Sequence, residues 1–203
     1  MKNQKTLIIF DFDNTLFKTR EFWREYLFPF YIKIGIPENY IEGAFIKATT
    51  VPVDYFVPKL FINELYSAVK KDNKYSRQQL KDIFKTHVYS PTVRKYFYPG
   101  SLRLLRKAKK KYKTLLISYG DKKFKTKFFN YCGLDRYFSS EEIIITGRKK
   151  AESLGRLAVP ENCVIIDDMK DEAKEMASFL VGKGISVKIL VAHRSLKEIL
   201  KKI

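Results

Sequence analysis

Acidic side chains follow two short apolar runs of the chain, and their type and spacing suit the binding of a hard metal ion. Asp11 and Asp13 lie in the segment Asp-Phe-Asp-Asn-Thr after the first run, and Asp167 and Asp168 are adjacent at the end of a later one. Paired acids at the ends of buried strands are costly without a cation, because burial disfavours the charged form. Carboxylate oxygens are ligands that Mg²⁺ accepts in proteins. The sequence therefore predicts a Mg²⁺ site built from these four aspartates.

A serine hydroxyl and two lysine side chains, which also follow apolar runs, are groups that could bind a phosphate. Ser118 ends another apolar run, and Lys149 and Lys150 follow a further one. A hydroxyl and an ammonium can hold phosphoryl oxygens as charge spreads over them. A carboxylate can attack phosphorus and divide hydrolysis into two steps through an acyl phosphate. A second carboxylate two residues on can protonate the leaving group and then activate water. These residues favour phosphoryl transfer, with Asp11 as nucleophile and Asp13 as general acid and base.

Short apolar runs rich in β-branched residues predict the elements that must position these groups. Between the later runs lie segments of helical character, and this alternation predicts an α/β fold with a doubly wound (Rossmann-like) parallel sheet. In such a sheet ligands bind at the carboxyl ends of the strands. We therefore expect the side chains that follow the strands to face one crevice: Asp11 and Asp13, Ser118, Lys149 and Lys150, and Asp167 and Asp168. The expected strands cover residues 6–11, 114–118, 143–146, 163–167 and 186–191. The expected helices between the later strands cover residues 101–113, 121–132, 151–157 and 172–183.

The interval between the first and second predicted strands is much longer than one crossover helix requires. It reads as several amphipathic helices separated by prolines, and we expect an inserted α-helical subdomain. The predicted organisation is an α/β core of residues 1–19 and 91–203 and a helical cap of residues 20–90. The expected cap helices cover residues 21–34, 37–49, 58–71 and 76–87.

The sequence also resembles the haloacid dehalogenase-like (HAD) superfamily over nearly its whole length. The segment from Asp11 to Thr15, followed by apolar residues, is similar to the first motif of that family, DxDxT. Ser118 after Leu-Leu-Ile is similar to the second motif, and Asp167-Asp168 after Ile-Ile is similar to the fourth in its paired-acid form. The insert resembles the family's C1 cap, of the kind found in phosphoglycolate phosphatases and nucleotidases.

The resemblance implies roles for the residues that match the motifs. Asp11 would be the nucleophile and a Mg²⁺ ligand, and Asp13 would be the general acid and base with its backbone carbonyl on the metal. Ser118 would bind the phosphoryl group, and Asp168 would ligate the metal with Asp167 ligating or supporting it. Asp171 and Glu172, on the following helical turn, would lie behind these ligands. The expected substrate-binding residues are Asn14, Thr15, Ser118, Tyr119, Gly120 and Lys149.

The third motif of the family is the least clear in this chain. Many relatives have Lys-Pro-x-Pro, whereas here Lys149-Lys150-Ala151 contains no proline. We favour Lys150, which would open the predicted helix, over Lys149 as the catalytic lysine. The presence of Asp13 implies phosphomonoester hydrolysis or phosphomutase chemistry, because the dehalogenase and P-type ATPase branches lack an acid at that place.

Composition narrows the class of protein further. The chain has 203 residues and is 45% hydrophobic, which suffices for a packed core, and its two cysteines argue against a disulfide framework or a zinc site. A reduced, cytoplasmic setting is the simplest expectation. No apolar stretch approaches the ~20 residues that a membrane span needs, so no membrane partner is expected. No pattern in the sequence indicates an oligomeric state.

The formal net charge of +18 favours anionic partners. The main hypothesis is a Mg²⁺-dependent phosphomonoesterase that acts on a small phosphorylated metabolite or nucleotide through an aspartyl phosphate. The alternatives are a nucleic-acid-binding or scaffolding protein on a HAD-like fold, or a phosphatase of nucleic-acid ends. The basic tract 106–113 fits the solvated outer face of a helix better than a nucleic-acid patch. Lys122, Lys123, Lys125 and Lys127 fit a solvated surface and the steering of an anionic substrate equally well.

Overall fold

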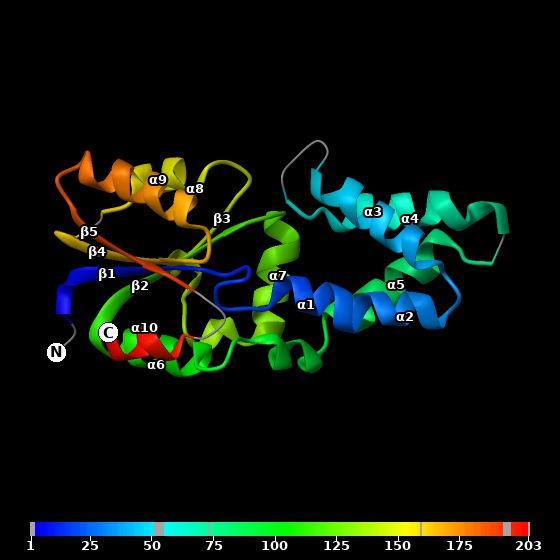
Figure 1. The fold of residues 1–203 in the computed structure, drawn as a ribbon, viewed down its shortest axis with the longest axis horizontal. Helices are drawn as coiled ribbons and strands as arrows, with labels where there is room; N and C mark the ends of the chain where they lie inside the picture. The colour runs from blue at the N-terminus through cyan, green and yellow to red at the C-terminus, as the bar shows by residue number, and fades with distance from the viewer. Residues whose placement is uncertain (1–2, 51–54, 73, 159, 193–195, 203) are drawn as a thin grey trace. The chain divides into compact units, whose positions relative to one another are not determined.

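The computed structural model describes residues 3–50, 55–72, 74–158, 160–192 and 196–202. The chain forms two compact units (Figure 1). The first unit comprises residues 1–19, 96–119 and 133–203, and the second comprises residues 20–95 and 120–132. Among the described residues, no helix has the length and apolar character needed to cross a membrane.

A parallel sheet forms the centre of the first unit. In the described part of the chain its strand order is β3-β2-β1-β4-β5, and every neighbouring pair is parallel. The α/β fold with a doubly wound parallel sheet is therefore confirmed, and each predicted run lies within an observed strand. The strands are β1 (Asn3–Asp11), β2 (Tyr112–Tyr119), β3 (Ile143–Thr146), β4 (Asn162–Asp167) and β5 (Ser186–Val191).

Helices cover both faces of this sheet, which is why its strands read as continuous apolar runs. Helices α8 and α9 lie on one face, and α6 and α10 lie on the other (Figure 1). On the α8–α9 face, Ile9, Ile117 and Ile165 come from adjacent strands and are almost fully buried. Burying each such side chain contributes about 1.5–3 kcal/mol. The helices are α6 (Ser101–Lys111), α8 (Lys150–Ser153), α9 (Lys170–Val181) and α10 (Lys197–Lys202), with short 3₁₀ helices at Leu134–Arg136, Ser140–Glu142 and Leu154–Arg156.

The second unit is helical and has an aromatic core. Trp23 packs with its ring centroid 5.4 Å from Phe45 and 4.4 Å from Phe56, and Phe56 contacts Phe84 at 6.0 Å. Its helices are α1 (Thr19–Glu21), α2 (Phe28–Lys33), α3 (Glu38–Thr50), α4 (Pro58–Val69), α5 (Arg77–Val88) and α7 (Lys122–Cys132), with a π-helical turn at Phe22–Leu27 and 3₁₀ helices at Lys70–Asp72 and Pro91–Tyr96.

Three details differ from the sequence-based expectations. The helix expected over residues 21–34 is interrupted by the π-helical turn, which places both Phe22 and Trp23 in the aromatic core. The helix expected over residues 151–157 is a single α-helical turn that continues as a 3₁₀ helix. The sequence favours placing α7 in the core, but this helix groups with the helical unit because Phe124 contacts Phe56 and Phe84.

Candidate active site

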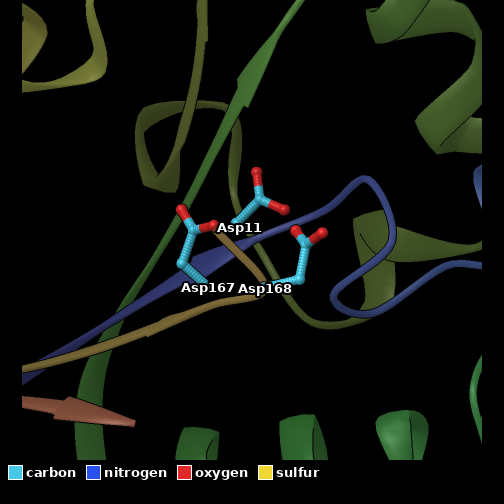
Figure 2. Close-up of side chains that lie close together, drawn as sticks. All are labelled: Asp11, Asp167 and Asp168. Carbon is cyan, nitrogen blue, oxygen red and sulfur yellow. The ribbon is translucent and has the colours of Figure 1, made fainter. Parts of the chain in front are cut away.

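Three aspartates gather at the carboxyl ends of β1 and β4. One carboxylate oxygen from each of Asp11, Asp167 and Asp168 lies within 4.8 Å of the others. Figure 2 shows the three side chains side by side at the ends of the two strands. Adjacent parallel strands with Phe10 opposite Ile166 bring these ends together, so the clustering follows from the register of the sheet.

Lys150 lies among the carboxylates from the start of α8. Its ammonium is 2.8 Å from Asp11 Oδ1, 2.9 Å from Asp167 Oδ2 and 2.7 Å from Glu172 Oε2. The Lys150 side chain is only 5% exposed. Burial by itself would lower the pKa of Lys150, but the three carboxylates outweigh burial and raise it, so the side chain is a cation.

For Asp11 the effect of burial on the pKa outweighs that of the neighbouring cation. Burial raises the pKa of Asp11 from 3.8 to about 8, and the charges of Asp167 and Asp13 add to this effect while Lys150 opposes it. Burial also raises the pKa of Asp168, helped by the charge of Asp167 and opposed by a hydrogen bond from Thr15. The site therefore holds more negative charge than one lysine balances.

These residues fit a divalent cation. The donor set is made of carboxylate oxygens, which Mg²⁺ accepts, and its members are close enough to share one ion. A cation there would lower the pKa of Asp11 and let the buried carboxylate ionise at neutral pH. Asp11, Asp167 and Asp168 are the side chains that would hold it. Asp13 is predicted to bind the metal through its backbone carbonyl, and its side chain is not in this group.

Asp13 is held instead by two hydroxyl groups. Thr19 Oγ1 donates a hydrogen bond of 2.8 Å to Asp13 Oδ1, and Ser118 Oγ donates one of 2.8 Å to Asp13 Oδ2. Ser118 is fully buried at the end of β2. The Asp13 carboxylate is thus fixed in orientation beside Asp11, and the hydroxyl predicted to bind phosphate is within reach of the same place.

The turn after β1 brings a further hydroxyl to the acidic cluster. Asn14 adopts a φ of 54°, a left-handed conformation that asparagine tolerates, and among the described residues no other non-glycine residue has a positive φ. The turn places Thr15 against β4: its hydroxyl donates to Asp168 Oδ1 at 3.0 Å and accepts from the Asp168 amide at 2.8 Å. Thr15 thereby orients a candidate metal ligand, whereas the sequence predicts a contact with substrate.

The two candidate lysines separate clearly. Lys149 is 64% exposed and pairs with the exposed carboxylate of Glu175 at 2.7 Å, away from Asp11. Adjacent lysines at the start of α8 thus contact different carboxylates, and the contact of Lys149 with substrate stays a prediction. Tyr119 lies closer, with Lys150 Nζ 5.5 Å from the centre of its ring. Gly120 follows Tyr119 in the chain and is grouped with the second unit.

The residues that surround the ligands differ from the sequence-based expectation at Asp171 and Thr19. Glu172 pairs with Lys150, whereas Asp171 is 93% exposed and pairs with Lys174 on the same helix. Thr19 is absent from the residues that the sequence predicts. A hydroxyl residue at the start of a helical segment shortly after DxDxT is the only signal for it, and that signal is common at helix starts.

The raised pKa of Asp11 predicts that the effect of Asp11→Asn on the stability of the protein depends on pH. The folded protein keeps a proton that the unfolded chain releases between pH about 4 and about 8, so the free energy of unfolding falls as the pH rises through this range. The amide introduced by Asp11→Asn carries no such proton. Without metal, we expect the Tm of Asp11→Asn minus that of the wild type to increase from pH about 5 to about 9. A difference that stays constant or decreases would contradict the assigned burial of charge.

Comparisons with known proteins identify the family and the fold. A model of the haloacid dehalogenase-like hydrolase family matches residues 5–179. No protein of curated function matches the chain in sequence. A haloacid dehalogenase-like hydrolase from Burkholderia xenovorans LB400 is 18% identical with a TM-score of 0.70, covering 93% of this chain and 84% of that one.

Two further solved structures show the same fold. The HAD-hydrolase YfnB from Bacillus subtilis, bound to magnesium, is 15% identical with a TM-score of 0.59, covering 98% of this chain and 99% of that one. A dehalogenase is 15% identical with a TM-score of 0.62, covering 100% of this chain and 99% of that one. Because the family model spans most of the sequence, this chain belongs to the haloacid dehalogenase-like hydrolase family.

Proposed function

We propose that this hydrolase is a Mg²⁺-dependent phosphomonoesterase in which Asp11 is the nucleophile and Asp13 is the general acid and base. The observation that carries the proposal is the placement of the Asp13 carboxylate, which Thr19 and Ser118 hold from both oxygens beside Asp11. Displacement of a halide needs no proton on the leaving group, whereas an alkoxide leaving from phosphorus does. A positioned acid at this place is therefore expected in a phosphatase, whereas the departure of a halide does not require one.

The acidic cluster supports the same reaction class. Asp11 is buried next to two other acids, and an anionic carboxylate approaching an anionic phosphate would be repelled. When bound by Asp11, Asp167 and Asp168, Mg²⁺ supplies positive charge that offsets this repulsion. Lys150 adds a fixed ammonium that contacts Asp11 and keeps one of its oxygens in place.

The residues suggest the following sequence of events. Asp11 attacks phosphorus and forms an acyl phosphate while Asp13 donates a proton to the departing alcohol oxygen. Asp13, now a carboxylate, takes a proton from water, which attacks the same phosphorus and releases phosphate and Asp11. The Ser118 hydroxyl, which donates to Asp13 in this structure, would turn to a phosphoryl oxygen when substrate binds. The substrate class we propose is a small phosphorylated metabolite or nucleotide.

A comparison of two substrate classes tests the proposal. Phosphate release from p-nitrophenyl phosphate and halide release from a 2-haloacid should be measured in parallel, each with Mg²⁺ and with EDTA. The proposal predicts phosphate release that stops with EDTA and no halide release. Halide release that persists in EDTA, without phosphate release, would assign the chain to the dehalogenases instead.

Thr19 offers a prediction specific to leaving-group protonation. Thr19→Val removes the hydroxyl that holds Asp13 Oδ1, and misplacing a general acid typically costs at least about tenfold in rate. We expect kcat for an alkyl phosphate to fall at least about tenfold, with a smaller change for p-nitrophenyl phosphate, whose leaving group needs less protonation. Thr19→Ser should keep most of the activity because it keeps the hydroxyl. Equal losses for both substrates would show that Thr19 acts on something other than the acid.

A further inference from the structure

Helix α6 presents a row of positive charge on the outer side of the first unit. Arg103, Arg106, Lys107 and Lys110 follow the spacing i, i+3, i+4 and i+7, which places them on one side of an α-helix. The opposite side of α6 is buried through Leu104, Leu105 and Ala108, so the row, called here the α6 stripe, faces away from the sheet. The Arg103, Arg106 and Lys110 side chains are exposed, and that of Lys107 is half-buried.

The exposed cations of the α6 stripe, those of Arg103, Arg106 and Lys110, have no ion-pair partner in the part of the chain that the structure describes. Helix α6 contains no acidic residue. By contrast, Lys109, on the flank of the helix, pairs with Glu142. Helix α9 shows the ordinary arrangement, since its exposed Lys174 pairs with Asp171 one turn away. The α6 stripe is thus a concentrated field of one sign.

This arrangement is unfavourable for the helix by itself. Like charges three or four residues apart destabilise a helix by roughly 0.2–0.5 kcal/mol per pair. Basic residues are favoured near the end of a helix by its dipole, which accounts for Lys110, but Arg103 lies in the first turn, where the dipole disfavours a cation. When exposed cations break these local rules and form no ion pair with any described residue, their partner is expected to lie outside the protein.

The chemistry of the α6 stripe indicates the kind of partner. The four cations of the α6 stripe extend over about 10 Å of helix. A row of this kind suits the closely spaced negative charges of a nucleic-acid backbone. A membrane surface normally adds apolar side chains that insert among the lipids. Helix α6 exposes none, because Leu104, Leu105 and Ala108 are buried and Leu102 is half-buried.

We propose that the α6 stripe binds the phosphate backbone of a nucleic acid, independently of base sequence and of the hydrolytic site. Lysine and arginine contacts of this kind release condensed counterions, so affinity falls steeply as the salt concentration rises. Arginine contributes two-pronged hydrogen bonds to phosphate in addition to its charge. The inference does not depend on the proposed phosphatase activity.

The test uses two variants with the same change in net charge. Arg103→Gln, Arg106→Gln and Lys110→Gln together remove the exposed charges of the α6 stripe, and glutamine keeps a comparable helix propensity. Lys59→Gln, Lys81→Gln and Lys85→Gln remove three exposed charges from α4 and α5 of the other unit. Binding of a fluorescent single-stranded RNA of mixed sequence is measured by anisotropy over a series of salt concentrations. Far-ultraviolet circular dichroism and hydrolytic activity check that both variants fold.

The α6 variant should bind RNA at least about tenfold more weakly at low salt, and its slope of log K against log salt should be shallower by about 2. The α4–α5 variant should bind within about twofold of the wild type. Equal losses in the two variants would overturn the proposal, because they would show binding by overall charge. It would also be overturned by a wild type that does not bind RNA at low salt. Binding to phosphatidylserine vesicles through the α6 stripe, with none to RNA, would assign the stripe to a membrane.

Discussion

Replacing Asp11 by asparagine should reduce phosphomonoester hydrolysis at least about 10³-fold while leaving the protein folded. The loss is large because the amide cannot form the acyl phosphate, and removal of a nucleophile typically costs factors of this size or more. The fold should persist because asparagine has nearly the same volume and adds no charge to a buried place that Asp11 occupies at 4% exposure. Steady-state phosphate release with saturating Mg²⁺ measures the effect.

The control for this variant is a substitution of Asp13, two residues along the chain. Asp13→Asn removes the general acid and base while leaving the nucleophile, so it should slow p-nitrophenyl phosphate less than an alkyl phosphate. Asp11→Asn should slow both substrates by the same factor. Near-normal turnover by Asp11→Asn would mean that another group attacks phosphorus.

Replacing Lys150 by glutamine should have the second-largest effect, on stability as well as on activity. Its ammonium contacts Asp11, Asp167 and Glu172, and all three carboxylates lose their counter-charge in the variant. Breaking a buried ion pair by removing one partner destabilises a protein by about 3–5 kcal/mol. In EDTA we expect a clear fall in Tm, partly reversed by Mg²⁺, and with Mg²⁺ a loss of activity of at least about 10²-fold.

Lys149 provides the matched control, because it has the same side chain one residue away. Its ammonium pairs with the exposed carboxylate of Glu175 rather than with Asp11. Lys149→Gln should change activity by less than about threefold and leave Tm unchanged in EDTA, as expected for an exposed ion pair. If Lys149→Gln lost more activity than Lys150→Gln, the assignment of the catalytic lysine would be reversed.

The strands at the centre of the sheet, β1, β2 and β4, were predictable because most of their residues are buried on both faces. An isolated apolar run such as Ile143–Thr146 leaves little ambiguity once helical segments flank it, and its observed bounds equal the predicted ones. The clustering of Asp11 with Asp167 and Asp168 then followed from topology, since parallel neighbouring strands end at the same edge.

Other features depend on rotations that periodicity does not specify. Asp171 and Glu172 are adjacent on α9, yet only Glu172 reaches Lys150, because one residue turns a helix by about 100°. The π-helical turn at Phe22–Leu27 changes the phase of the helix expected over residues 21–34, and local propensity does not indicate it. Thr19 reaches Asp13 only because of the turn after β1, which the sequence does not define.

The grouping of α7 shows a different limit. Its sequence has the ordinary amphipathic pattern of a helix in an α/β unit, and its place between β2 and β3 favours assignment to the core. The distinguishing feature is the chemistry of its buried side, where Phe124 and Phe128 stack at 5.7 Å and match the aromatic interior of the helical unit. The aromatic character of the buried residues, rather than their spacing, indicates that α7 belongs to the helical unit.

A covalent intermediate on Asp11 is the most direct test of the central claim. The wild type and Asp13→Asn are mixed with Mg²⁺ and p-nitrophenyl phosphate, whose leaving group needs little protonation. The samples are quenched in acid and examined by mass spectrometry of the peptide that contains residue 11. We expect one phosphoryl group on Asp11, removable by hydroxylamine and more abundant in Asp13→Asn, because that variant lacks the base for the second step. Phosphate release by the wild type with no phosphoryl group on Asp11 in either protein would contradict this claim, because water would then attack the substrate directly.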